Sequence, residues 1–219
     1  MNKKLGLTVC LLALALCSMP ALGQTLYSNL GSGNNVYNCC SGWTISGTGS
    51  IGTSFTSANE FQVTASGNVG QIDVGVGLVE GTNSFYVAID ADNNGTPGAQ
   101  LAMFPGLSSS TTFGQCCGLV TISNISGLSL STGTNYWMVI GPTNTASSTW
   151  EAWNFSNSAT GIDQYSTDGG LTWNSNGVQP QGAFDILGGG GTTPEPASLL
   201  LFGTGLVGVF GAFRRKMKL

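Results

Sequence analysis

The sequence predicts an all-β protein whose central part folds as an antiparallel β-sandwich of the jelly-roll kind. Three observations predict this fold class. The chain is rich in Gly, Ser, Thr and Asn, with 34 glycines in 219 residues, and it is poor in the residues that favour helices. Its apolar residues recur in short alternating segments. Clusters of turn residues divide the chain into strands spaced by about ten residues.

Alternation with a period of two is clearest between residues 72 and 78, where apolar residues alternate with Asp73 and two glycines. Such alternation is typical of half-buried strands that place one face on a core. Shorter examples are Phe61–Val63, Phe85–Ile89, Val120–Ile122 and Trp137–Val139. We therefore expect strands between residues 24 and 187, and no helix in this region.

Turn residues lie between the expected strands. Gly, Asn and Pro supply positive φ angles or side-chain bonds to the local backbone. They cluster in the segments Gly31–Asn35, Glu80–Asn83, Asn93–Gly98 and Thr132–Asn135. Their spacing predicts short antiparallel strands with tight connections.

The first 23 residues have the three parts of a secretory signal peptide. Two lysines precede an apolar run at residues 5–16, and the small-residue site Ala21-Leu22-Gly23 follows. The run is too short to span a hydrocarbon core of about 30 Å as a helix. We expect export through the Sec translocon and cleavage after Gly23, which leaves residues 24–187 as the folded ectodomain.

The distribution of charge excludes several functions. All six basic residues lie near the chain ends, and residues 5–213 contain no Lys, Arg or His. Nucleic-acid binding depends on cations that neutralise phosphates, so we expect no nucleic-acid partner. No His base or reactive Lys is present for catalysis, and we expect a protein that is not an enzyme. Scattered carboxylates leave glycoside hydrolysis as an alternative, and neutral sugars and divalent cations stay open as ligands.

Four cysteines remain after the signal peptide is removed, as the adjacent pairs Cys39-Cys40 and Cys116-Cys117. An even number of cysteines in an exported chain indicates disulfides. A bond between adjacent cysteines is geometrically strained, so we expect two bridges that join one pair to the other. Such bridges close a long loop and stabilise the fold by about 4 kcal/mol. A zinc site of four thiolates is the alternative, but adjacent cysteines lack the usual ligand spacing.

The segment that begins at Asp90 contains one candidate for metal binding. Asp90, Asp92 and Asn94, followed by Gly95, match the first half of an EF-hand-like calcium loop. The second half does not match, because Leu101 stands where a bidentate Glu is required. A turn that closes a hairpin explains the same residues. We expect no cofactor, and weak calcium binding by this segment is the alternative.

Aromatic residues are candidates for a surface that stacks on sugars. They are Tyr136, Trp137, Trp150, Trp153, Tyr165 and Trp173. Trp and Tyr bury large apolar areas, so most of them are expected in a core. Trp150 and Trp153 are three residues apart, and an odd offset places residues on opposite faces of a regular strand. We expect one of these two to face outward, where it can contact a glycan.

The segment from Ser166 to Trp173 resembles the Asp-box, a β-hairpin with the pattern Ser-x-Asp-x-Gly-x-Thr-Trp that also includes Asp168 and Gly170. The resemblance implies that Asp168 binds the backbone of the turn and that Trp173 packs beneath it. Sialidases carry several such hairpins, but they hold the carboxylate of sialic acid with arginines. The ectodomain has no arginine, so we expect a single structural hairpin.

The end of the chain has the composition of an anchor. A Gly-rich linker at residues 188–193 is flexible by composition. An apolar run at residues 197–213 is near the lower length limit for a transmembrane helix. The basic cluster after it is expected to stay cytoplasmic by the positive-inside rule, which leaves the ectodomain outside the inner membrane.

This tail, residues 194–219, resembles the PEP-CTERM sorting domain. The residues that carry the resemblance are Pro194, Glu195, Pro196, Arg214, Arg215 and Lys216. In that family an exosortase, a membrane-bound transpeptidase-like enzyme, recognises the tail in bacteria that make extracellular polysaccharide. The resemblance implies an exosortase-type partner, whereas an ordinary single-span anchor is the alternative.

The ectodomain resembles, more loosely, the β-domains beside such tails that are grouped as choice-of-anchor domains. The residues concerned are Phe85–Asp90, Thr96–Leu101 and Gly133–Val139. This group implies no activity. We expect an exported structural or adhesive component of the cell envelope or extracellular matrix, linked to exopolysaccharide. A carbohydrate-binding module, with or without calcium, is the first alternative, and a glycoside hydrolase is the second.

Overall fold

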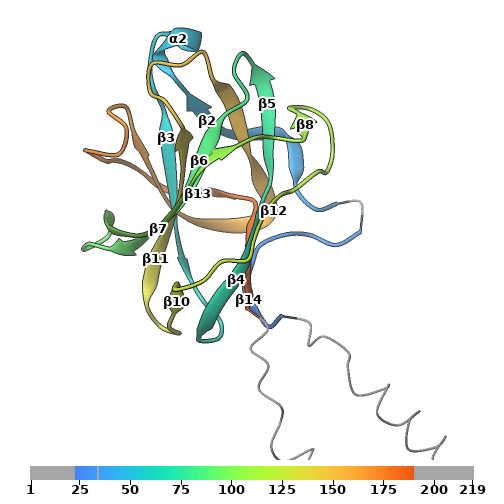
Figure 1. Ribbon diagram of the computed structural model, residues 1–219, viewed down its shortest axis with the longest axis vertical. Coiled ribbons are helices and arrows are strands. Elements are labelled where there is room, and N and C mark those ends of the chain that lie inside the picture. The colour runs from blue at the N-terminus through green and yellow to red at the C-terminus, as the bar shows by residue number, and fades with distance from the viewer. Residues whose placement is uncertain (1–22, 34, 190–219) are drawn as a thin grey trace, which may run out of the picture. The chain divides into compact units, whose positions relative to one another are not determined.

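Strands make up nearly all the regular structure in the computed structural model of the chain, which describes residues 23–33 and 35–189 (Figure 1). In this part of the chain, fourteen strands form a five-stranded and a nine-stranded sheet. Each strand pairing is antiparallel except that of β5 with β8. The predicted all-β sandwich is confirmed.

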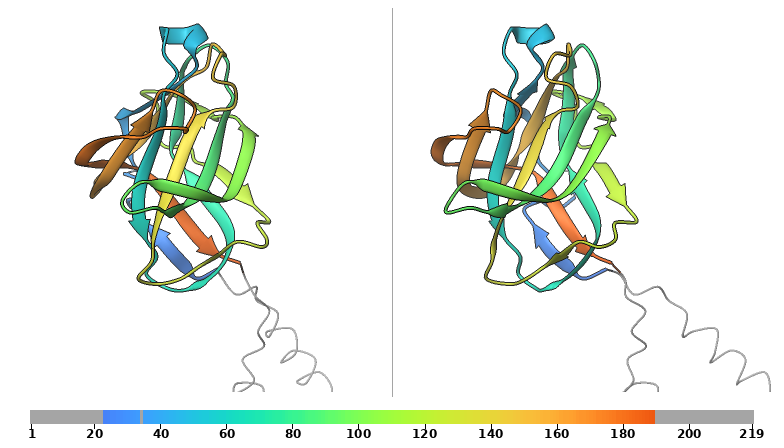
Figure 2. Two further views of the ribbon diagram at one scale, coloured as in Figure 1. Left: turned by 90° about the vertical axis from the view of Figure 1, so that its left-hand side faces the viewer. Right: turned by 60° about the vertical axis from the view of Figure 1, so that its left-hand side comes forward.

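The smaller sheet has the strand order β1-β14-β4-β10, and β9 also pairs with β4. Its strands are β1 (Thr25–Ser28), β4 (Gly67–Val74), β9 (Val120–Ser123), β10 (Ser129–Leu130) and β14 (Phe184–Gly188). The first and the last strands of the described chain therefore lie side by side. Gly188 donates its backbone N–H to the carbonyl of Gln24 over 2.6 Å, and Figure 2 shows these two ends at the same edge of the domain.

The larger sheet has the strand order β7-β6-β11-β3-β12-β5-β8, and β2 and β13 also pair with β12. Its strands are β2 (Asn38–Ser46), β3 (Thr56–Gln62), β5 (Val76–Glu80), β6 (Phe85–Asp92), β7 (Pro97–Leu107), β8 (Thr111–Thr112), β11 (Asn135–Pro142), β12 (Trp150–Ser166) and β13 (Asn174–Gly182).

Strand β12 changes partners along its 17 residues. Its first part, Trp150–Phe155, pairs with β2, and its last part, Asp163–Ser166, pairs with β3. The register shifts between these parts, as expected where a strand bends. Because β2 and β3 follow different parts of β12, they separate from each other and leave space between them.

The alternating run at residues 72–78 forms two strands instead of one. Strand β4 ends at Val74 in the smaller sheet, and β5 begins at Val76 in the larger sheet. Gly75 lies between them, and a Cβ atom there would come within 2.9 Å of the Tyr37 ring. The period-two pattern identifies strand residues on both sides of the break, but the pattern itself does not show that the chain crosses between sheets.

The main core lies between the sheets and takes side chains from both. Its largest fully buried members include Trp153, Phe85, Phe184 and Ile72. Aromatic contacts join the two layers, since Phe184 of β14 lies 5.9 Å from Trp153 of β12 between ring centroids. Burial of this apolar surface is the main favourable contribution to folding.

A second cluster lies on the other face of the larger sheet. Ala58, Ala88, Trp137 and Val139 form it, and Trp173 packs against it. Strand β11 is consequently buried on both faces. The period-two alternation predicted only one buried face for this strand. The Trp137 indole donates to Asp92 Oδ1 over 2.9 Å, so its polar group is satisfied.

One short helix, α2 (Thr48–Ile51), follows β2. The prediction of no helix was wrong here, because a single turn is too short to produce a helical pattern in the sequence. Gly52 ends the helix with φ 83°, and its N–H donates to the Thr48 carbonyl. Within the described residues, no helix has the length and apolar character needed to cross a membrane.

Candidate functional site

The predicted sorting residues lie outside the described residues. They are Pro194, Glu195, Pro196, Arg214, Arg215 and Lys216, and the predicted membrane helix at 197–213 lies there too. The predicted signal peptide also falls outside, except for Gly23. The structure therefore describes the ectodomain.

The two tryptophans proposed for sugar stacking have different environments. Trp153 has no exposed surface, and its indole donates to the Ala183 carbonyl over 3.2 Å in the core. Trp150 is half-buried at the beginning of β12. The structure thus corrects the inclusion of Trp153 in a glycan surface, because a side chain enclosed between two sheets cannot reach a ligand.

The residues of the half calcium loop form the end of β6 and a turn. The Asp92 carboxylate accepts from the backbone N–H of Gly95 at 3.0 Å and from the Trp137 indole. Asn94 has φ 53°, which suits a tight turn. No cluster of three acidic, His or Cys side chains suited to a metal occurs among residues 23–33 and 35–189. Calcium binding by Asp90, Asp92 and Asn94 stays a prediction.

The Asp-box segment is a turn held by its own side chains. Asp168 accepts from the backbone N–H groups of Leu171 and Thr172 at 3.0 and 2.9 Å and from the Thr172 hydroxyl. These bonds hold the pKa of Asp168 at about 2. The Ser166 hydroxyl accepts from the Gly170 N–H at 2.8 Å, and Trp173 packs on the second cluster.

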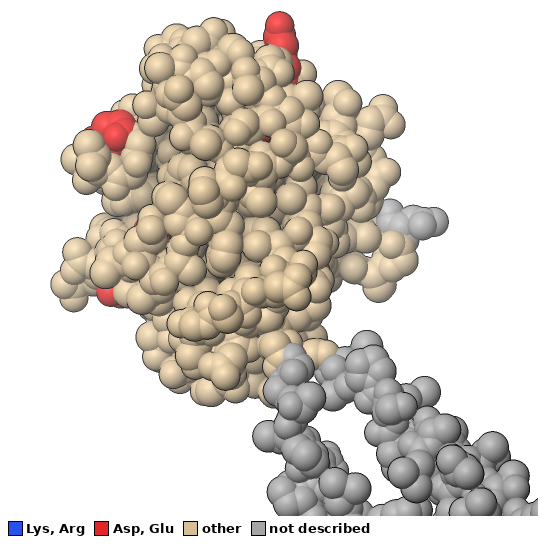
Figure 3. Space-filling model, in the orientation of Figure 1, with Lys and Arg blue, Asp and Glu red and all other residues tan. Residues whose placement is uncertain are grey.

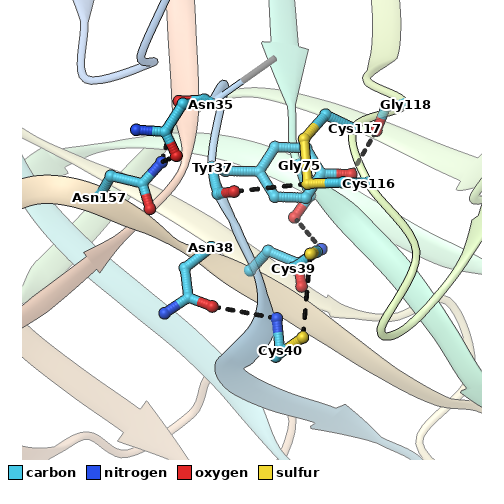
Figure 4. The surroundings of a disulfide bond; sticks show 11 residues. Asn35, Tyr37, Asn38, Cys39, Cys40, Gly75, Cys116, Cys117, Gly118 and Asn157 are labelled. Atoms are coloured by element: carbon cyan, nitrogen blue, oxygen red, sulfur yellow. Dashed lines mark hydrogen bonds between the residues drawn. A yellow bond between two sulfur atoms is a disulfide. The ribbon is translucent and has the colours of Figure 1, made fainter.

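The four cysteines lie on two neighbouring segments (Figure 4). Cys116 and Cys117 are bonded to each other, whereas Cys39 and Cys40 are free thiols with sulfur atoms 3.9 Å apart. The segments contact through the backbone, since Gly114 donates to the Cys39 carbonyl over 2.8 Å. This arrangement differs from the predicted bridges between the pairs. The two pairs lie on neighbouring segments, and bridges that join one pair to the other stay a prediction.

An open groove with a volume of about 620 Å³ lies where β2 and β3 separate. This volume falls within the range of about 300–1,000 Å³ that is common for ligand pockets. None of the lining residues is charged. They are Gly42, Trp43, Thr44, Ile51, Phe55, Ser57, Tyr165, Thr167 and Asn176.

Three aromatic rings of the groove come from different parts of the chain. Trp43 lies on β2, Phe55 lies just before β3, and Tyr165 lies near the end of β12. The Phe55 and Tyr165 centroids are 6.2 Å apart. The Trp43 indole donates to the Pro180 carbonyl over 3.1 Å, and its ring packs edge-on against Phe155. These contacts hold the Trp43 ring in one orientation.

Backbone contacts shape the groove. A Cβ atom on Gly42 would lie 2.5 Å from the Trp153 carbonyl oxygen, so glycine lets β2 approach β12 closely. Ser46 and Phe55 form an antiparallel bridge, with N–H to carbonyl distances of 3.1 and 2.8 Å. This bridge closes the connection through α2 and brings Ile51 to the groove.

A buried carboxylate supports the polar side of the groove. Asp163 has no exposed surface and accepts from Asn176 Nδ2 at 2.5 Å, from Ser57 Oγ at 3.3 Å and from Asn59 Nδ2 at 2.8 Å. Burial raises the pKa of Asp163 to about 6, and the bonds from Asn176, Ser57 and Asn59 oppose this rise. Asp163 therefore positions Asn176 and Ser57, both of which line the groove.

Sequence reasoning identified Tyr165 as a candidate but missed Trp43, Phe55 and Asn176. Trp43 and Tyr165 are distant in the sequence, and only the change of partners along β12 brings them to one groove. A Gly-Trp step within a strand was the one local signal, because glycine in a strand often indicates close backbone approach.

Other carboxyl groups are buried or half-buried away from the groove. Burial raises the pKa of Asp90 to about 6, of Asp185 to about 7 and of Glu151 to about 8. Asp185 faces Asp73 across β14 and β4, and that neighbour raises its pKa further. Few carboxylates are visible on the face in Figure 3, and no Lys or Arg occurs among the described residues.

Comparison with known families identifies one match. Residues 192–216 match the PEP-CTERM protein-sorting motif. No curated protein matches the chain. The motif supports an exported protein of the cell surface or envelope that an exosortase-type enzyme processes. The predicted resemblance of the tail is confirmed, and that of the ectodomain to choice-of-anchor domains stays a prediction.

Proposed function

We propose that this exported chain, with its PEP-CTERM sorting motif, is a non-catalytic structural or adhesive component of the envelope or extracellular matrix, linked to exopolysaccharide. The observation that carries the proposal is the motif at residues 192–216, because it directs a protein to the cell exterior without implying a reaction. Processing by an exosortase-type enzyme delivers the β-sandwich to the surface or releases it.

The chemistry of the ectodomain supports a role without catalysis. Its sequence offers no Lys, Arg or His between residues 5 and 213. Retaining glycoside hydrolysis uses two carboxyl groups about 5 Å apart, on either side of the bond that is cleaved. Asp73 and Asp185 are neighbours, but neither lines the groove. The carboxyl groups are thus better explained as parts of the folded framework.

A second candidate function is carbohydrate binding, and the aromatic groove favours it. Asp90, Asp92 and Asn94 do not line this groove, so calcium is given no part in binding there. Binding and a structural role are compatible, since a matrix component is held in place by its contacts with the polymer around it.

Substitution of the tail motif tests the proposed function. Pro194, Glu195 and Pro196 are changed together to Ala in the full chain, and Lys218→Gln, which lies outside the matched residues, is the control. We expect the unchanged chain and the control in the surface or matrix fraction, and the triple variant retained in the inner membrane. Equal distribution of all three proteins would contradict sorting by this motif.

A further inference from the structure

We propose that the groove between β2 and β3 binds a segment of an uncharged polysaccharide, with Trp43, Phe55 and Tyr165 as its stacking surface. The inference rests on the proposed function for the source of the polymer, which is the extracellular matrix. It adds to that function a site and a ligand class.

The rings account for the apolar part of the recognition. One face of a pyranose ring presents mainly C–H groups, which pack on aromatic rings through dispersion and weak C–H contacts. Trp43 is held by Pro180 and Phe155, so little side-chain entropy is lost on binding. Phe55 and Tyr165 are half-buried, so part of each side chain is accessible, and their ring centroids lie 6.2 Å apart.

Neutral polar groups beside the rings can orient the bound sugar through hydrogen bonds. The hydroxyl groups of Thr44, Tyr165 and Thr167 have no hydrogen-bond partner within the described part of the chain. Asn176 gives one N–H to Asp163 and keeps its amide oxygen and second N–H for a ligand. Hydroxyl and amide groups both donate and accept, which matches the alternating requirements of sugar hydroxyls.

Charge selects a neutral polymer. The groove is lined by no charged residue, and residues 23–33 and 35–189 contain no Lys or Arg to pair with an acidic sugar. Exposed carboxylates such as Glu80 and Asp168 give the domain a negative field that repels polyanions. An open groove also accepts an internal segment of a chain, whereas an enclosed cavity accepts only a small molecule or a chain end.

Binding of soluble polysaccharides to the full exported chain tests the inference. The probes are two neutral polymers, dextran and hydroxyethyl cellulose, and one acidic polymer, alginate, measured by affinity electrophoresis and titration calorimetry. The variants are Tyr165→Ala, which removes one ring, and Thr167→Glu, which adds charge and bulk from an exposed position. Leu171→Ala is the control, because this side chain is 85% exposed and lies outside the groove.

We expect binding to at least one neutral polymer and none to alginate. Tyr165→Ala and Thr167→Glu should weaken binding by about tenfold or more, and Leu171→Ala should leave it unchanged. Circular dichroism tests whether each variant is folded. If Tyr165→Ala does not fold, the binding of Thr167→Glu decides the result.

Three outcomes overturn the inference. They are equal affinity of the folded groove variants and the unchanged chain, binding to alginate alone, and no binding to either neutral polymer. None of these outcomes contradicts the proposed function if the protein is still found in the matrix fraction. Absence from that fraction contradicts the proposed function instead, and the binding measurements on purified protein still decide the groove.

Discussion

Asn176 donates to Asp163 over 2.5 Å, and this bond links an exposed amide of the groove to a carboxylate with no exposed surface. Asp163 lies on β12 and Asn176 on β13, so the bond also joins the two strands of a hairpin. The buried Asp163 carboxylate therefore fixes the orientation of the exposed Asn176 side chain.

Loss of this bond should destabilise the domain. Asn176→Ala removes a donor from a buried carboxylate, and we expect the free energy of unfolding to fall by about 1–2 kcal/mol. Asn174→Ala is the matched control, since Asn174 is exposed on the same strand. Urea unfolding followed by tryptophan fluorescence measures both variants. Equal stability of the two would show that Asp163 does not depend on this donor.

Stability should decrease as the pH rises, because of Glu151. Burial raises the pKa of Glu151 to about 8, so the folded chain keeps this proton more firmly than the unfolded chain does. The resulting stability is fully present below the ordinary Glu pKa of about 4.5 and is lost as the pH rises through about 8.

Glu151→Gln should reduce the fall in thermal midpoint between about pH 4.5 and pH 8, because the amide has no charged form. Glu80→Gln is the control, since Glu80 is exposed. Asp90, Asp163 and Asp185 also have raised pKa values, and they should add an equal loss of stability to both variants between about pH 4 and pH 7. An equal fall in thermal midpoint for Glu151→Gln and Glu80→Gln between pH 4.5 and pH 8 would contradict the assignment.

Trp153 should act as a core residue. Trp153→Ala removes a fully buried ring, and we expect a loss of about 3–5 kcal/mol in the free energy of unfolding. Trp150 is half-buried, so Trp150→Ala should lower the free energy of unfolding by only about 1 kcal/mol. Urea unfolding compares the two variants. Similar small losses for both would mean that Trp153 is not enclosed between the sheets.

The cysteine connectivity can be decided chemically. After alkylation of free thiols, peptide mapping without reduction should find label on Cys39 and Cys40 and a bond between Cys116 and Cys117. That bond closes no long loop, so reduction should lower stability by less than about 1 kcal/mol. Linked peptides from the two pairs, with a loss of about 4 kcal/mol on reduction, would support the bridges that the sequence predicts.

Much of the fold could be predicted from local patterns. Alternation located strand residues in β4, β6, β9 and β11, because side chains on a strand alternate between two faces. The pattern failed where tertiary contacts decide which sheet a strand joins or which of its faces is buried. Gly75 carries the chain from one sheet to the other, and Trp137 is buried on the face opposite the main core.

The candidate site was less predictable than the fold. Trp153 and Tyr165 both lie on β12, yet one is enclosed between the sheets and the other lines the groove. This difference arises from the partners of each part of the strand, which are pairings distant in sequence. The sorting motif could be recognised from the sequence because it is defined by residues that follow one another along the chain.

The most direct test of export and sorting is the intact mass of the protein recovered from its native host, in membrane, matrix and medium fractions. We expect a species in the matrix or medium that begins at Gln24 and ends near Pro196, without the apolar segment and the basic cluster. A membrane-bound species that retains Leu219 as the only form would contradict it, because the tail would then serve as a plain anchor.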